Sequence, residues 1–360
     1  MKSLYIHIPF CSSICTYCDF CKLFYKEDLV LDYLNALERE VLEFYNNEPI
    51  ETIYIGGGTP SSLSDAALNK LFSITSHINK DNLKEYTFEC NINDITEPLI
   101  RKLINEGINR LSIGVESFNK EKLAFMERTA DFKDVLEKIN LIKTLGITNI
   151  NIDLMYGIPN ETLNVLKKDL KQILKLNPTH ISTYSLILED HTKLSSQDIE
   201  PTDDELESQM YEYIRKKLLS KKFKHYEISN FALEGYESTH NLTYWNNEEY
   251  YGFGLGAHGY IEGFRYENTR NITKYINDEY RLEEKLLSNQ EEMENEIMLG
   301  LRKIEGINLQ KFYDKYKVNL QDVFPIKPLI KNKDLIYQNG YVYINPEKIY
   351  IMNEILLKLI

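Results

Sequence analysis

The first half of the chain alternates short apolar runs with longer stretches in which apolar residues recur every three to four positions. Short runs of this kind predict β-strands, and the longer stretches predict amphipathic helices. The expected strands cover residues 4–8, 52–55, 86–89, 110–115, 149–154 and 180–188, and the expected helices cover 27–44, 64–78, 97–106, 132–145 and 161–176.

Six strand–helix units in succession predict an α/β fold whose parallel strands are joined by right-handed crossovers. We expect these units to close into a partial (β/α)6 barrel. In barrels of this kind the functional residues stand at the carboxyl ends of the strands. The search for a site therefore begins where each expected strand ends.

The alternation stops after residue 188. A helix is expected at 203–219 and a strand at 225–231, followed by the Gly- and aromatic-rich segment YWNNEEYYGFGLGAHGY. Beyond residue 285 the pattern is helical until LIYQNGYVYI, in which Asn339-Gly340 predicts a type I′ hairpin. We expect a barrel over 1–232, a connecting segment over 233–284 and a small helical, winged-helix-like domain over 285–360.

The formal net charge of −13 argues against a broad phosphate-binding surface, so we expect no nucleic-acid partner. The N-terminus shows no secretory pattern and no apolar run approaches membrane-spanning length. We therefore expect a cytoplasmic protein whose only contact with a membrane would be peripheral. Thiols stay reduced there, and clustered cysteines bind metal more often than they form disulfides.

Four of the five cysteines fall in one segment, HIPFCSSICTYCDFC, directly after the first expected strand. Cys11, Cys15 and Cys18 follow a C-x3-C-x2-C pattern, and iron–sulfur clusters are held by cysteines at such short spacings. A zinc site usually has a second CxxC-like pair, and a dithiol redox motif would leave Cys11 without a role. The spacing favours an iron–sulfur site, while zinc and a purely structural role stay open.

Residues that suit a cofactor follow the next strands. The segment YIGGGTPSSL comes after the second strand, and its glycines allow a ligand to approach the backbone closely. Glu89, Glu116 and Asp153 stand near the ends of the third, fourth and fifth strands. Each feature alone could be a tight turn, a solvated cap or an ion pair, but together they favour a binding site.

A strand followed by C-x3-C-x-aromatic-C, within six β-α units, resembles the radical S-adenosyl-L-methionine (SAM) superfamily. The resemblance implies that Cys11, Cys15 and Cys18 ligate three irons of a [4Fe–4S] cluster and that SAM chelates the fourth. An electron passed from such a cluster to SAM releases a 5′-deoxyadenosyl radical, so the cofactors perform the chemistry. Cys21 is then a spare or transient ligand, or a small buried residue.

The phrases YIHIPFC, GGGTPSSL, LSIGVESF, NIDLMYGIP and THNLTYW resemble one branch of that superfamily. It contains oxygen-independent coproporphyrinogen III oxidases (HemN type) and their haem-chaperone relatives (HemW type). The resemblance covers nearly the whole chain. It implies that the residues around SAM are Tyr5, Tyr17, Gly57, Gly58, Thr59, Glu89, Glu116, Arg128 and Asp153.

Two positions depart from the family pattern. Glu116 stands where the family usually has glutamine, and its carboxylate would repel that of SAM. Around Arg128 the usual Gly-Arg-x-His is here ERTA, which keeps only the arginine. Both departures bear on SAM affinity and turnover, and neither touches the cluster.

Three features favour the chaperone type over the oxidase type. The oxidases carry an extension ahead of the first strand, which starts here by residue 3, and their fourth cysteine follows as C-x-C rather than C-x2-C. HNLTYW matches the H-N-x-x-Y-W signature of the chaperones, and an imidazole can ligate haem iron. We expect His240 to bind haem, with His258 of GLGAHGY as the alternative.

The main hypothesis is a haem-binding radical SAM protein that delivers haem to an acceptor protein. The alternatives are the decarboxylating coproporphyrinogen III oxidase, a radical SAM enzyme acting on RNA, and a cluster-bearing protein without SAM chemistry. The acidic balance and the lack of a basic aromatic segment count against RNA. Whether SAM is cleaved is left open.

Overall fold

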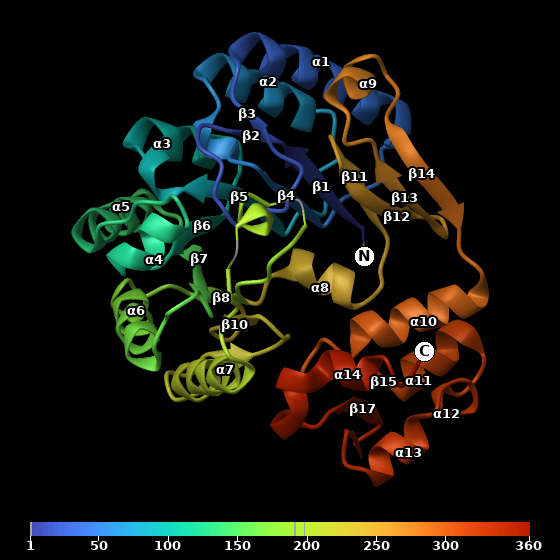
Figure 1. The fold of residues 1–360 in the computed structure, drawn as a ribbon. Helices are drawn as coiled ribbons and strands as arrows, with labels where there is room; N and C mark the ends of the chain where they lie inside the picture. Colours follow the sequence, from blue (N-terminus) through green and yellow to red (C-terminus); the bar gives the residue numbers. More distant parts are fainter. Residues whose placement is uncertain (1, 191, 198) are drawn as a thin grey trace.

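The computed structural model describes residues 2–190, 192–197 and 199–360. Its core is a long curved sheet (Figure 1). The strands of this sheet are β1 (Ser3–Ile8), β4 (Thr52–Gly57), β5 (Glu85–Asn91), β6 (Arg110–Glu116), β7 (Asn149–Tyr156), β8 (His180–Ser185), β9 (Lys224–His225), β10 (Asn230–Ala232), β11 (Tyr250–Phe253), β12 (His258–Ile261), β13 (Phe264–Asn268) and β14 (Arg281–Leu286).

The strand order confirms the predicted α/β fold and partial barrel. β1, β4, β5, β6, β7 and β8 are adjacent in this order and all pair in parallel. All of the strands expected in the first half of the chain are present, most of them longer by one to three residues. Parallel pairing brings their carboxyl ends to one edge of the sheet, which is where the site was expected.

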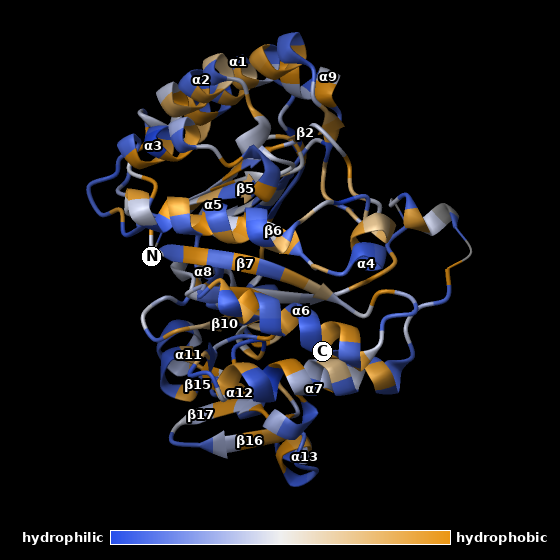
Figure 2. Cartoon of the chain, turned by 90° about the vertical axis from the view of Figure 1, so that its left-hand side faces the viewer, coloured by the Kyte–Doolittle hydropathy of each residue, from blue (hydrophilic) through white to orange (hydrophobic). Residues whose placement is uncertain are grey.

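Helices cover the outside of the curved sheet (Figure 1). Ser64, Thr96 and Thr162 act as N-caps, because each side chain accepts a hydrogen bond from a backbone N–H in the first turn. Figure 2 shows hydrophobic and hydrophilic residues alternating around α5 and α6, as expected for helices with one face on a sheet. The helices are α1 (Glu27–Phe44), α2 (Asp65–Thr75), α3 (Glu97–Asn105), α4 (Lys120–Phe125), α5 (Phe132–Leu145), α6 (Leu163–Lys175), α7 (Asp204–Leu219), α8 (Thr239–Trp245) and α9 (Ile272–Ile276).

Two parts of the sheet differ from expectation. The single strand expected at 225–231 is wrong, because the chain turns at 226–229 and forms the antiparallel pair β9–β10. The segment over 233–284, expected to connect two domains, supplies strands to the barrel sheet. β11 pairs in parallel with β1, and β12, β13 and β14 continue the sheet as antiparallel neighbours.

Helix α8 closes the amino-terminal end of the barrel and carries the HNLTYW residues. Glu85, the first residue of β5, accepts hydrogen bonds from the backbone N–H groups of Thr239 and His240 at the start of this helix. A carboxylate at a helix N-terminus also interacts favourably with the helix dipole. Thr243 lies 2.7 Å from Ser3, the first residue of β1, measured between hydroxyl oxygens. We call α8 the floor helix.

The C-terminal residues form a small three-stranded antiparallel sheet with helices on it, as expected for a winged-helix-like unit. Asn339 and Gly340 both have positive φ (53° and 82°), which confirms the predicted hairpin. No helix in the described residues is both long and apolar enough to cross a membrane. The elements are α10 (Asn289–Gly300), β15 (Ile307–Asn308), α11 (Leu309–Tyr316), α12 (Leu320–Val323), α13 (Ile326–Lys331), β16 (Leu335–Gln338), β17 (Tyr341–Ile344) and α14 (Met352–Leu356).

A fully buried carboxylate, Glu40, ties α1 to the later strands of the sheet. It accepts hydrogen bonds from Gly254 N (2.8 Å), Asn268 Nδ2 (2.6 Å) and Tyr275 Oη (2.6 Å), and Arg281 Nη1 lies 3.0 Å from its Oε1. Every oxygen is therefore partnered, as a buried charge requires.

We expect Glu40→Ala to lower the free energy of unfolding by about 3 kcal/mol, because it removes the shared acceptor of Arg281 and of three other buried donors. Glu43→Ala, an exposed position on the same helix, is the matched control and should change stability by less than about 0.5 kcal/mol. Urea unfolding measures both. Equal effects would show that the buried network contributes nothing.

Candidate functional site

A cavity of about 350 Å³ opens at the carboxyl ends of the parallel strands. It is lined by the cysteine segment, the glycine-rich turn after β4 and the ends of β5 to β8. Tyr5 and His240 are not part of this lining. The expected site residues that do line it are Cys11, Cys15, Tyr17, Cys18, Gly57, Gly58, Thr59, Glu89, Glu116, Arg128 and Asp153.

The cysteine segment is anchored to the barrel at both ends. Within it, β2 (Phe10–Cys11) pairs in parallel with β3 (Leu23–Phe24). In its middle, Thr16 donates its hydroxyl to the carbonyl oxygen of Phe125 at 2.9 Å, and its N–H donates to that of Met126. The loop that carries the three cysteines is thus fixed on the end of α4 rather than free in solvent.

The cysteine thiols are held close to one another in a partly desolvated setting. Burial raises the pKa of Cys11 and raises that of Cys18 to about 11, with further contributions from the neighbouring cysteines. A strongly positive centre is needed to convert such thiols to thiolate ligands.

The spacing of the thiols bears on which centre fits. No His, Cys, Asp or Glu side chains in the described ranges are grouped so that three or more could hold a single metal ion. A four-iron cluster spreads its thiolates over separate irons, so it needs them farther apart than one ion does. Cys11, Cys15 and Cys18 line the cavity as free cysteines and supply the kind of donor that an iron–sulfur cluster takes.

Cys21 lies apart from the other three. Its side chain packs against Gly256, where an added Cβ would come within 3.2 Å of Sγ, and close to Arg270. Its carbonyl oxygen lies 2.7 Å from His7 Nε2, and His7 Nδ1 lies 2.9 Å from the hydroxyl of Tyr5. Tyr5 thus supports the end of the cysteine segment from inside the barrel.

The glycine-rich turn approaches the cysteine segment closely. Gly57 has a φ of +115°, and a Cβ on it would overlap the His7 ring at 2.4 Å. A Cβ on Gly58 would lie 2.7 Å from the carbonyl oxygen of Phe10. Any side chain here would push the two loops apart, so the glycines serve loop packing as well as an open cavity wall.

The carboxylates differ in their settings. Glu89 accepts hydrogen bonds from Tyr54 Oη at 2.7 Å and from Gly57 N at 3.0 Å, so it holds the glycine turn. Asp153 accepts one from Asn151 Nδ2 at 2.7 Å. Removal from water, together with the nearby Glu116 charge, raises the pKa of Asp153 to about 8. Asp153 is then largely protonated at neutral pH.

Glu116 and Arg128 lie side by side over Gly114. An added Cβ on Gly114 would be 3.2 Å from Glu116 Oε1 and 3.0 Å from Arg128 Nη2. Arg128 donates to the Gly114 carbonyl at 2.5 Å and to Cys15 Sγ at 3.4 Å, and so connects β6 to the cysteine segment. The positive charge of the Arg128 guanidinium offsets the negative charge of Glu116, which was expected to repel the carboxylate of SAM.

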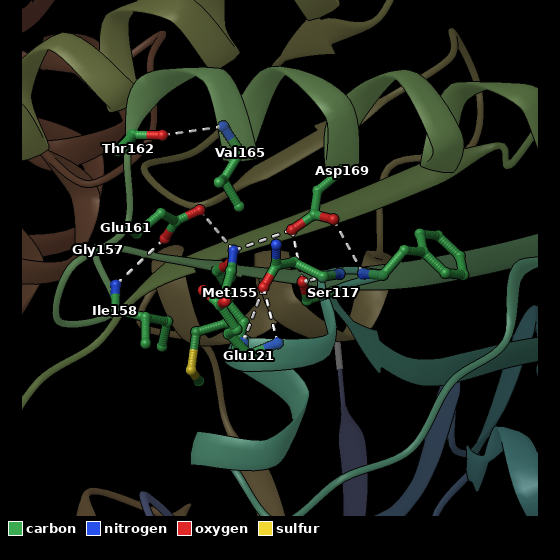
Figure 3. Close-up of polar contacts among 12 residues, drawn as sticks. Ser117, Glu121, Met155, Gly157, Ile158, Glu161, Thr162, Val165 and Asp169 are labelled. Carbon is green, nitrogen blue, oxygen red and sulfur yellow. Dashed lines mark hydrogen bonds and ion pairs between the residues drawn. The ribbon is translucent and has the colours of Figure 1, made fainter.

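A buried ion cluster supports the turn after Glu116, which itself has a left-handed φ of 67°. Lys122 Nζ lies 2.6 Å from Glu161 Oε1 and 3.1 Å from Asp169 Oδ2, and donates to the Met155 carbonyl at 2.8 Å. Figure 3 shows Glu161 and Asp169 turned inward from α6 and the loop before it, with Ser117 bonded to Asp169. The cluster joins β6, α4, β7 and α6.

Several residues that line the cavity were not predicted from the sequence, among them Tyr54, Arg110, Ser112 and Asn241. A signal was present for some of them, because β6 reads RLSIGVE. Its Leu and Ile residues are fully buried on the outer face, under the helices, while Arg110 and Ser112 point into the barrel. No sequence signal marked Lys122, whose partners lie about 40 and 47 residues further along the chain.

His240, the residue expected to bind haem, lies in a buried hydrogen-bond network. Its Nδ1 lies 2.8 Å from the Thr52 hydroxyl and its Nε2 lies 2.8 Å from Tyr244 Oη. It is 1% exposed, and burial lowers its pKa to about 3. Both ring nitrogens are engaged, at the end of the barrel opposite the cysteines, so haem ligation by His240 would require breaking at least one of these hydrogen bonds.

His258, the alternative, lies elsewhere. It begins β12 directly after the turn that packs on Cys21, and that turn follows the carboxyl end of β11. Its side chain is 60% exposed, with Nε2 3.9 Å from a carboxylate oxygen of Glu267. The two histidines therefore differ in exposure and in the end of the barrel that they occupy.

Comparison with known proteins agrees with this geometry. The profile of the "Radical SAM superfamily" matches residues 5–173, and that of the "HemN C-terminal domain" matches residues 287–349. A Lactococcus lactis protein named "Heme chaperone HemW" is 40% identical, with 94% of this chain and 91% of that protein covered. A Bacillus subtilis protein of the same name is 39% identical, with 99% of this chain and 98% of that protein covered.

Among solved structures, coproporphyrinogen III oxidase from Escherichia coli superposes with a TM-score of 0.86, covering 99% of this chain and 89% of that one. The identity is 21%, so this likeness concerns the fold.

We expect Lys122→Met to lower the free energy of unfolding by about 3–5 kcal/mol, because Glu161 and Asp169 would remain buried without a cation. Lys120→Met, at an exposed position on the same helix, is the control and should cost less than about 0.5 kcal/mol. Chemical denaturation of both variants measures the difference. A small loss in Lys122→Met would mean that the carboxyls are neutral in the folded state.

Proposed function

The chain belongs to the radical SAM superfamily and, within it, to the family of the haem chaperone HemW, and from this premise we propose that it binds haem and delivers it to an acceptor protein. Membership of the superfamily implies a [4Fe–4S] cluster and SAM. One observation carries the proposal: a single cavity at the strand ends is lined by Cys11, Cys15 and Cys18 together with the carboxylates and glycines expected around SAM.

The three cysteines would hold the cluster, which when bound supplies the electron for cleavage of SAM. The chain's own contribution is to position and to shield. Arg128 fixes the cysteine segment through Cys15, and Glu89 holds the glycine turn. Glu116 and Arg128 present opposite charges to the amino and carboxylate groups of SAM, so both ends of its methionine part have a partner.

Haem would bind beside this cavity. Phe20 and Ile187 line its mouth and are 60% and 64% exposed, which offers apolar surface to a planar ligand. We propose His258 as the protein ligand to the iron, because its imidazole is exposed and follows the turn packed on Cys21. A neutral imidazole supplies the lone pair that haem iron needs.

The oxidase function is the less supported alternative. The relatives that match over nearly the whole chain carry the chaperone name, whereas the oxidase is similar in fold at 21% identity. The described cysteines are free thiols, and a cluster requires them reduced, which suits the cytoplasm as the place of action.

For the cluster, we expect Cys11→Ala, Cys15→Ala and Cys18→Ala each to abolish iron and sulfide binding after anaerobic reconstitution. Cys21→Ala is the control and should retain most of both, because its side chain packs on Gly256 outside the cavity. Iron and sulfide analysis with EPR of the reduced protein measures this. Equal loss in all four variants would require four-cysteine ligation and leave SAM no open iron.

For haem, we expect His258→Ala to weaken binding by about tenfold, the effect of losing about 1.4 kcal/mol of interaction, and to shift the Soret band. His240→Ala should keep haem affinity but lower the free energy of unfolding by about 1–3 kcal/mol, because it removes two buried hydrogen-bond partners. Haem titration and urea unfolding separate the two effects. The reverse pattern would return the ligand role to His240, and absence of haem binding in the unmodified protein would refute the chaperone function.

A further inference from the structure

The cavity continues below the expected SAM residues to the floor helix. Arg110, at the first position of β6, and Asn241, the second residue of the HNLTYW motif, both line it. The amino-terminal start of β6 and the floor helix mark the deep end of the barrel. Neither Arg110 nor Asn241 is among the residues assigned above to the cluster, SAM or haem.

Arg110 is a buried cation whose guanidinium is only partly satisfied: its charge is near enough to Glu89 to offset part of the rise that burial causes in the pKa of that carboxyl, but no hydrogen bond joins the two side chains. It is 2% exposed, and its one hydrogen bond joins Nη1 to the Thr87 hydroxyl at 3.4 Å. Its Nε is buried without a partner, and it forms no ion pair with the described carboxylates. A buried donor without a hydrogen-bond acceptor is costly, so a ligand group that accepts from Nε and a terminal nitrogen of Arg110 would remove that cost.

Asn241 is held in place by its neighbour and keeps its own amide free. His240 is fixed to Thr52, and the backbone N–H of Asn241 donates to Ser238 Oγ at 3.3 Å. Within the described residues, the side-chain amide of Asn241 has no hydrogen-bond partner. His240 therefore fixes the floor helix to the barrel, while the unpaired side-chain amide of Asn241 lines the cavity.

The other polar groups nearby are already engaged. Asn151 donates to Ser112 and Asp153, and accepts from Ser182 at 3.0 Å. Glu89 is bonded to Tyr54 and Gly57. Burial raises the pKa of Asp153 to about 8, so it adds little negative charge at neutral pH. Arg110 and Asn241 thus keep donors that these neighbouring groups do not use.

We propose that Arg110 and Asn241 form a binding site for a carboxylate at the deep end of the barrel. A carboxylate matches the fork of a guanidinium with two parallel hydrogen bonds, and an amide N–H can donate a third. The ligand is a small carboxylic acid or the carboxylate arm of a larger molecule held in the barrel. The site shares no residue with those assigned above to haem.

Equilibrium dialysis of isotope-labelled propionate against the reconstituted protein with its oxidised cluster tests this site. We expect saturable binding at one site per chain, which neutral propionamide does not compete for. Arg110→Gln should weaken it by at least about tenfold, and Asn241→Asp should do the same by adding a repelling charge. Arg101→Gln, an exposed arginine on α3 paired with Glu97, removes the same charge outside the cavity and should change nothing.

A second arm identifies the source of the carboxylate. Saturating SAM excludes propionate if the carboxylate is that of SAM, and leaves its binding intact if a second molecule supplies it. The inference is overturned if the unmodified protein shows no saturable binding, or if both Arg110→Gln and Asn241→Asp bind propionate normally. Cluster content, haem titration and melting temperature are measured on the same samples, so failure here is distinct from misfolding and from failure of the proposed function.

Discussion

The polar interior of the barrel is the constraint on which the rest of the molecule depends. Alternation along each parallel strand sends one set of side chains to the outer helices and the other into the barrel, and many of the inward ones are polar. Each must find a partner or a ligand, because buried polar groups without one are costly. At the amino-terminal end the floor helix supplies the partners. Its backbone N–H groups donate to Glu85, and the His240 ring is hydrogen-bonded to Thr52. At the carboxyl end the groups are left for cofactors.

The same constraint explains the charges at the mouth. Glu116, Glu89 and Asp153 could not all be ionised in one cavity without cations. Arg128 lies beside the first, hydrogen bonds hold the second, and the third keeps its proton at neutral pH. The buried Lys122 cluster lies behind them and fixes the turn that carries Glu116. This wall of the cavity is therefore held by buried contacts between the chain's own residues.

Most of the barrel could be predicted from the sequence, because its helices and strands carry local signals: periodicity, N-caps and the loop that follows each strand. The cysteine segment could be predicted for the same reason, since its spacing is local. The strands β11 to β14 could not, because their pairing with β1 depends on a contact between residues such as Ser3 and Tyr250. The hydrogen-bonded setting of His240 could not be predicted, because a motif states which residue types recur and not which end of a barrel they reach. Only its hydrogen bonds to Thr52 and Tyr244 distinguish an anchor from a ligand.

The pairing of β1 with β11 has a consequence for biosynthesis. β1 precedes the other described strands in the sequence, yet it lies inside the sheet, and one of its two neighbours is made only when residues 250–253 appear. Contacts of such large sequence separation form slowly, and until then one edge of β1 is unpaired and prone to wrong associations. The packing of Cys21 also depends on this later part of the chain, because Gly256 and Arg270 lie against it. The setting of the cysteine segment is therefore completed only by a distant part of the chain, so a barrel that lacked β11 and the turn after it would leave Cys21 without its packing partners.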